Sequence, residues 1–214
     1  RIVETDYLVT NNTLPEIDET ARIVFENLVK RGVEAINKGD FEKVVLSRKE
    51  EVLLRQFDLE AVFKKLITFY PTAFKYCFFH PKIGMWMGAT PEQFLKINQR
   101  ALQTVALAGT QIATKTENVS WPEKEIEEQR LVTEFITTGL QDKVSEMTLS
   151  SPYSVKAGIL WHIKTDISAT IKSKKAKAEI IKILHPTSAV CGLPKESAKV
   201  SILKNESYDR EYYA

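Results

Sequence analysis

The sequence predicts an α+β fold in which helices cover antiparallel sheet. Residues 19–38 and 59–69 carry apolar side chains at helical spacing. Residues 75–107 hold short apolar or alternating runs that follow one another closely. This spacing favours an antiparallel meander over βαβ units. No internal repeat, low-complexity stretch or linker is evident along the chain.

Residues 1–19 have no clear period. The first predicted helix covers residues 19–38, and Gly39 and Asp40 end it. The apolar stripe of this helix consists of Phe25, Leu28, Val29, Val33 and Ile36. Residues 41–54 read as a β-rich segment, and Pro71 stops the helix over 59–69. The predicted meander strands cover residues 75–79, 85–87, 93–97 and 102–107.

The second half begins with a capping-box pattern at Ser120–Glu123, which predicts a helix from there to about Asp142. A long strand is expected over residues 159–171, because its apolar side chains largely alternate. Residues 174–184 are predicted to be helical, and Pro194 is expected to open a last helix.

Composition limits the classes of function. The 214 residues are 43% hydrophobic and 27% charged, which is typical of a globular chain able to bury a core. A net charge of +2 gives no reason to expect nucleic acid or an anionic membrane as partner. No apolar run reaches the roughly 18 residues of a membrane span. Cys77 and Cys191 form no CxxC pair, so we expect reduced thiols in a cytoplasmic protein.

Two charged residues stand at positions where apolar neighbours are expected. Glu128 shares a helix face with Val132 and Phe135, and its carboxylate there needs a metal ion, a basic side chain, or a place at the edge of the stripe. The other glutamates of that first turn, Glu123, Glu125 and Glu127, are expected to be solvated. In a pleated strand Lys43 shares a face with Val45 and Ser47. It is therefore either a desolvated general base or an edge-strand lysine.

The remaining candidates are less specific. His162 lies in the middle of the long predicted strand, and the three histidines are too far apart to form a recognisable zinc site. Two loops of small residues, 88–92 and 106–110, allow a backbone to approach a small anionic ligand closely, but they also make ordinary turns.

Six segments taken together, in this order, resemble the chorismate-binding enzymes. They are residues 43–48 (KVVLSR), 88–92 (GATPE), 107–110 (LAGT), 124–132 (KEIEEQRLV), 160–162 (LWH) and 185–194 (HPTSAVCGLP). The family includes isochorismate synthase, salicylate synthase, anthranilate synthase component I and aminodeoxychorismate synthase. The resemblance covers residues 41–214 and implies an α/β sandwich of antiparallel sheets with helices outside.

The resemblance also implies roles for individual residues. Lys43 matches the general base that activates water for attack at C2 of chorismate, and Glu92 matches the acid that protonates the departing C4 hydroxyl. Glu128 matches a ligand of Mg²⁺. The positions that match the substrate pocket are Gly109, Thr110, His162, Ala189 and Val190.

Two positions favour one member of the family. Relatives that use ammonia lack the lysine found here as Lys43, and the anthranilate enzymes carry threonine where this chain has Ala189. Both point to water, and hence to isochorismate synthase or salicylate synthase, of which we favour a Mg²⁺-dependent isochorismate synthase. The alternatives are a salicylate synthase, which goes on to eliminate pyruvate, and a binding-only degenerate relative. Gln111 and Gln129 depart from residues common in the family.

The expected organisation is an N-terminal lead-in and helix, residues 1–40, followed by an incomplete catalytic domain, residues 41–214. The resemblance implies a C-terminal continuation that supplies a second metal-binding glutamate and an arginine. We therefore expect negligible turnover from residues 1–214 alone, and a monomer. The pathway, menaquinone or siderophore, is left open.

Overall fold

The computed structural model describes residues 18–52, 54, 56–90, 92–113 and 119–213. Its helices are α1 (Glu19–Lys38), α2 (Leu59–Phe69), α3 (Glu123–Leu140), α4 (Ala176–Leu184) and α5 (Lys195–Asn205). Its strands are β1 (Lys43–Val44), β2 (Phe74–His80), β3 (Gly84–Thr90), β4 (Lys96–Asn98), β5 (Ala101–Ile112), β6 (Val144–Leu149), β7 (Tyr153–Ala157), β8 (Leu160–Ile171) and β9 (Gly192–Leu193). Among these residues no helix is long and apolar enough to cross a membrane.

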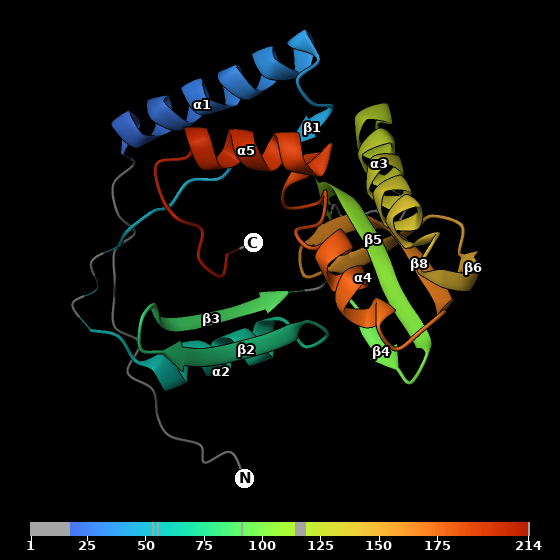
Figure 1. The fold of residues 1–214 in the computed structure, drawn as a ribbon. Coiled ribbons are helices and arrows are strands. Elements are labelled where there is room, and N and C mark those ends of the chain that lie inside the picture. Colours follow the sequence, from blue (N-terminus) through green and yellow to red (C-terminus); the bar gives the residue numbers. More distant parts are fainter. Residues whose placement is uncertain (1–17, 53, 55, 91, 114–118, 214) are drawn as a thin grey trace.

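The largest sheet is antiparallel and runs β4-β5-β8-β6, with β7 also paired to β8. Along β8 buried residues alternate with half-buried ones from Ile163 to Ile171, because one face of the strand meets the core. Helices α3 and α4 cover that face (Figure 1). The core beneath them includes Leu102, Ala106, Val132, Ile136, Ile167 and Ile180. The predicted long strand is confirmed, whereas β6 and β7 had no prediction.

A second sheet is a hairpin of β2 and β3, and α2 lies against it (Figure 1). The predicted single meander is therefore wrong in one respect. Strand β3 ends at Thr90 and β4 begins at Lys96, and β4 pairs with β5 in the other sheet. The segment after α5 reaches this hairpin, where the ring of Tyr212 packs edge-on against Phe78 and Trp86.

A third, two-stranded sheet joins distant parts of the chain, because β1 pairs with β9. The predicted β-rich segment over residues 41–54 is much shorter than expected. Its partner β9 has two residues and is followed by Pro194, which has no N–H to continue the ladder. Only glycine fits at position 192, since a Cβ there would lie 2.2 Å from the carbonyl oxygen of Lys43.

The helix ends show where local signals were sufficient. Helix α1 matches its predicted bounds, begins after an Asp18 carboxylate that accepts from the Ala21 amide at 3.0 Å, and ends at left-handed Gly39. Helix α2 also matches its predicted bounds. The capping box predicted for α3 is wrong, because the helix is preceded by Pro122 and has no side-chain cap.

Candidate active site

The centre of the candidate site is an ion pair between β1 and α3. The Nζ atom of Lys43 lies 3.0 Å from Oε1 of Glu128, and the two side chains are 13% and 36% exposed. The lysine is therefore nearly buried, and the carboxylate on the edge of the apolar stripe is met by a cation. Residues 85 positions apart are joined here because β1 pairs with β9 beside α3.

Glu92 lies in the segment that follows β3, and its backbone N–H donates to the hydroxyl of Thr90 at 3.2 Å. Burial raises the pKa of its carboxyl, and the positive charge of Lys43 acts weakly in the opposite direction. Glu92 thus has a poorly hydrated carboxyl that also feels the positive charge of Lys43. It also lines a cavity of about 750 Å³ that includes Lys164 and Asp166 of β8.

Gly109, Thr110 and His162 form a second cluster at a bulge in the β5–β8 ladder. The register shifts between Ala108 and Thr110, and Gly109 takes a φ of +72°. The Nδ1 atom of His162 lies 3.1 Å from the Gly109 carbonyl oxygen and 3.2 Å from the Thr110 hydroxyl. A proton on Nδ1 would be donated to that carbonyl, leaving Nε2 as an acceptor.

The two clusters meet at the first turn of α3. A Cβ added to Gly109 would lie 3.1 Å from Cβ of Glu125, one helical turn before Glu128. Glu125 itself was missed, because we expected it to be solvated with Glu123 and Glu127. Those two are exposed, but Glu125 is half-buried and its Oε2 atom is buried without a hydrogen-bond partner. The spacing of three residues from Glu128 was the available signal.

Ala189 and Val190 lie between α4 and β9. Ala189 packs against the core under α3 and α4. The carbonyl of Val190 accepts a hydrogen bond from Arg210. The carbonyl of Cys191, the following residue, accepts from the amide of Val45, which comes directly after β1, at 2.8 Å. The loop is therefore fixed to the strand that carries Lys43.

Two acidic side chains of α3, Glu125 and Glu128, could supply part of the ligand shell of a hard divalent cation. Magnesium commonly takes one or two protein carboxylates and completes its shell with water or substrate oxygens. Glu125 and Glu128 share a face of α3, and the unpartnered oxygen of Glu125 is suited to such an ion. Within the described ranges no cluster of three or more histidine, cysteine or acidic side chains could hold a metal.

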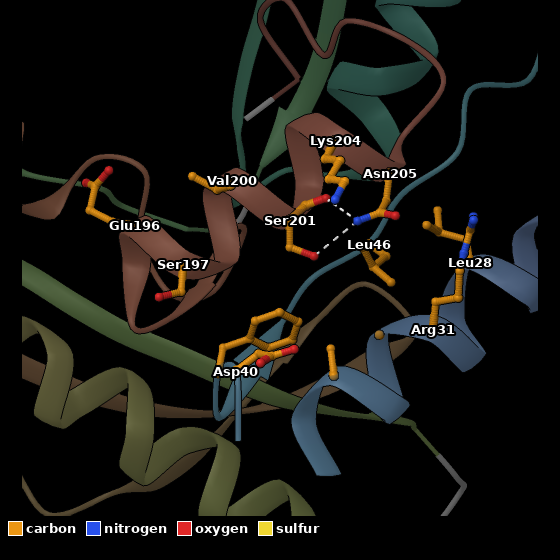
Figure 2. A pocket seen from close by; sticks show the side chains of 13 residues that line it. Leu28, Arg31, Asp40, Leu46, Glu196, Ser197, Val200, Ser201, Lys204 and Asn205 are labelled. Carbon is orange, nitrogen blue, oxygen red and sulfur yellow. Dashed lines mark hydrogen bonds between the residues drawn. The ribbon is translucent and has the colours of Figure 1, made fainter. Parts of the chain in front are cut away.

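Two further cavities lie apart from the Lys43–Glu128 ion pair and from Glu92. One of about 610 Å³ separates α1 from α5, and Figure 2 shows Leu28, Leu46 and Val200 on its walls. Another, of about 780 Å³, lies between α3 and the β7–β8 edge and includes Trp121 and Tyr153. Neither is lined by Lys43, Glu92 or Glu128.

Comparison with known proteins identifies the relatives of this chain. Residues 3–214 match the model of a family described as chorismate binding enzyme. Isochorismate synthase EntC of Escherichia coli K12 is 27% identical over 96% of the chain, and isochorismate synthase MenF of Haemophilus influenzae is 28% identical over 87%. The solved structure of the menaquinone-specific isochorismate synthase MenF from E. coli has a TM-score of 0.77 at 23% identity over 97% of the chain.

The chain spans about half the length of these relatives, namely 54% of EntC, 45% of the H. influenzae MenF and 52% of the solved E. coli chain. The structural likeness confirms the predicted fold class, in which antiparallel sheets are covered by helices.

Proposed function

This chain belongs to the chorismate-binding enzyme family, and on that premise we propose that it carries part of the catalytic core of an isochorismate synthase. The observation that carries the proposal is the ion pair of Lys43 with Glu128, together with a buried Glu92 whose carboxyl feels the charge of the same lysine. Support comes from relatives that are themselves named isochorismate synthase.

The proposed reaction moves a hydroxyl group around the chorismate ring. In its neutral form the amine of Lys43 removes a proton from water, and the water oxygen bonds to C2. The ring double bond shifts, the C4–oxygen bond breaks, and Glu92 gives its proton to the departing oxygen. One water enters and one leaves, so the reaction is an isomerisation. A base and an acid in separate places suit this displacement, since hydroxide leaves poorly without a proton.

Burial of Glu92 favours its proposed role. A carboxyl whose pKa is raised keeps its proton to higher pH than an exposed glutamate, so it can act as an acid. Lys43 is held by the Glu128 carboxylate, which fixes the direction of the amine. The backbone bulge at Gly109, with His162 and Thr110 beside it, would line the substrate pocket.

Glu128 and Glu125 are the residues that would hold Mg²⁺. When bound, the ion would neutralise the ring carboxylate of chorismate and fix the position of the ring. The alanine at position 189 is consistent with water rather than ammonia as the nucleophile. We further propose a cytoplasmic, monomeric enzyme whose partner is the small-molecule substrate.

The test uses the natural full-length protein, chorismate and Mg²⁺, with the products separated by chromatography. We expect isochorismate, lost on chelation with EDTA and reduced about 100-fold or more in Lys43→Ala. The matched control is Lys49→Ala, because Lys49 pairs with Glu51 at the surface and is 59% exposed. Salicylate with pyruvate would instead indicate a salicylate synthase. A wild-type protein that binds chorismate but forms no product would favour the binding-only alternative.

A further inference from the structure

A second ion pair, behind the strand of Lys43, is more deeply buried than the first. Arg210 and Glu206 meet through two contacts, Nη2 to Oε1 at 2.6 Å and Nε to Oε2 at 2.7 Å. Their side chains are 11% and 1% exposed. A buried ion pair costs desolvation free energy that its own attraction barely offsets, so it is poor evidence for added stability. Its other contacts therefore indicate what it does.

The arginine binds the backbone on both sides of the pair. Its Nη1 donates to the carbonyl of Val190 at 2.9 Å, and its Nη2 donates to the carbonyl of Val45 at 2.8 Å. A planar guanidinium presents its donors in a fixed fork, which a lysine cannot reproduce. One side chain thus joins the Ala189–Val190 loop to the residue two positions after Lys43.

The glutamate binds the same strand two residues further along. Its Oε1 accepts from the Ser47 amide at 2.7 Å and from the Ser47 hydroxyl at 3.1 Å. The ladder between β1 and β9 has only two residue pairs, and one more backbone bond, from the Val45 amide to the Cys191 carbonyl at 2.8 Å, follows it. The Val45 carbonyl and Ser47 lie beyond that bond. The ion pair binds the backbone groups that this short ladder does not reach, namely the Val45 carbonyl and the Ser47 amide.

We propose that the Glu206–Arg210 ion pair is a positioning device, which holds the Lys43 strand and the Val190 loop in fixed register. This inference rests on the proposed function, in which Lys43 is the general base. Neither Glu206 nor Arg210 contacts the reacting groups in this account. They act through the backbone of residues 45–47, because a shift of that segment moves the amine relative to water and substrate.

The main experiment compares Arg210→Lys with wild type in the natural full-length protein. The substitution keeps the charge and loses the fork. We expect kcat to fall about tenfold, since displacement of a catalytic group by about 1 Å costs up to about 100-fold. We expect KM for chorismate to change less than threefold. The matched control is Arg22→Lys, because Arg22 forms an exposed pair with Glu26 at 2.9 Å on α1.

A double-mutant cycle separates positioning from a merely structural role. In a Lys43→Ala background, Arg210→Lys should lower the residual kcat less than twofold, because the group that it positions is gone. The same tenfold loss in both backgrounds, or a wild-type kcat in Arg210→Lys, would overturn the inference.

Hydrogen–deuterium exchange gives a readout that is independent of the reaction. In Arg210→Lys the peptide covering residues 43–48 should exchange at least tenfold faster, with no change in α1. Unchanged exchange there would contradict the clamp whatever the activity. Faster exchange in a protein whose wild type forms no isochorismate would mean that the proposed function has failed while the clamp of the strand holds.

Discussion

Glu92 sets the pH range in which the proposed chemistry can operate. Its carboxyl must be protonated to serve as the acid, and burial raises its pKa. A group with a raised pKa is protonated below that value and loses its proton as pH rises through it. We therefore expect kcat to fall on the alkaline side, with a midpoint above the usual glutamate value of about 4.3.

The variant that checks this is Glu92→Gln, which keeps the shape of the side chain and cannot give up a proton. Its kcat should be about 100-fold lower and should lack that falling limb. The control is Glu127→Gln, an exposed glutamate paired with Arg130 on α3. A profile of kcat against pH with the same limb in Glu92→Gln would assign the titration to another group.

Glu125 carries the prediction about metal binding. Its Oε2 atom is buried without a partner, three residues before Glu128. Glu125→Gln should weaken Mg²⁺ binding about tenfold, because a charged ligand is replaced by a neutral amide. Isothermal titration of the full-length protein measures this, with Glu123→Gln as the exposed control. Equal affinities in the two variants would remove Glu125 from the metal site.

The site was only partly predictable from individual residues. Glu128 and Lys43 stood out because each placed a charge on an apolar face, and the structure pairs them. Glu92 carried no such sign in its local sequence, since its burial comes from elements distant along the chain. Glu125 was misread as solvated because a glutamate in a first helical turn is most often exposed. Its burial depends on the bulge at Gly109.

At the scale of elements, the approach of β1 to β9 depends on one glycine. In Gly192→Ala the new Cβ would meet the Lys43 carbonyl oxygen, so the strands must separate. We expect a loss of at least 2 kcal/mol of unfolding free energy, together with loss of activity. The control is Gly84→Ala, which has the strain of a positive φ but nothing within 4 Å. If chemical denaturation gave the same loss of unfolding free energy in both variants, backbone strain rather than the clash with Lys43 would account for the loss.

Element bounds were predicted well where the determinants are local. The helical spacing of apolar residues and the residues that end the helices predicted the bounds of α1 and α2. Such residues act within one helical turn, so the local sequence is sufficient. The β1 strand was predicted too long, because the length of a strand depends on its partner, here β9. The capping box at Ser120 failed for a local reason, since Pro122 occupies the position before the helix and no side chain caps it.

At the scale of the whole molecule, the candidate site is assembled from separate layers. Lys43 comes from the two-stranded sheet, Glu128 from a helix over the large sheet, and Glu92 from the end of the hairpin sheet. Fold class could be read from the spacing of strands and helices. The meeting of these residues could not, because no local pattern gives the pairing of β1 with β9. The resemblance to a family supplied that information instead.

The pairing of Lys43 with Leu193 also orders events during synthesis of the chain. Chains are made from the N-terminus, so the strand that holds the base emerges about 150 residues before its partner, at roughly 5–20 residues per second. Throughout that interval of roughly 7–30 seconds the lysine has no partner strand to hold it, whether or not α1 has formed. The large sheet can be complete from residue 171 onward. The proposed site thus cannot form in the nascent chain until the ribosome has passed Leu193.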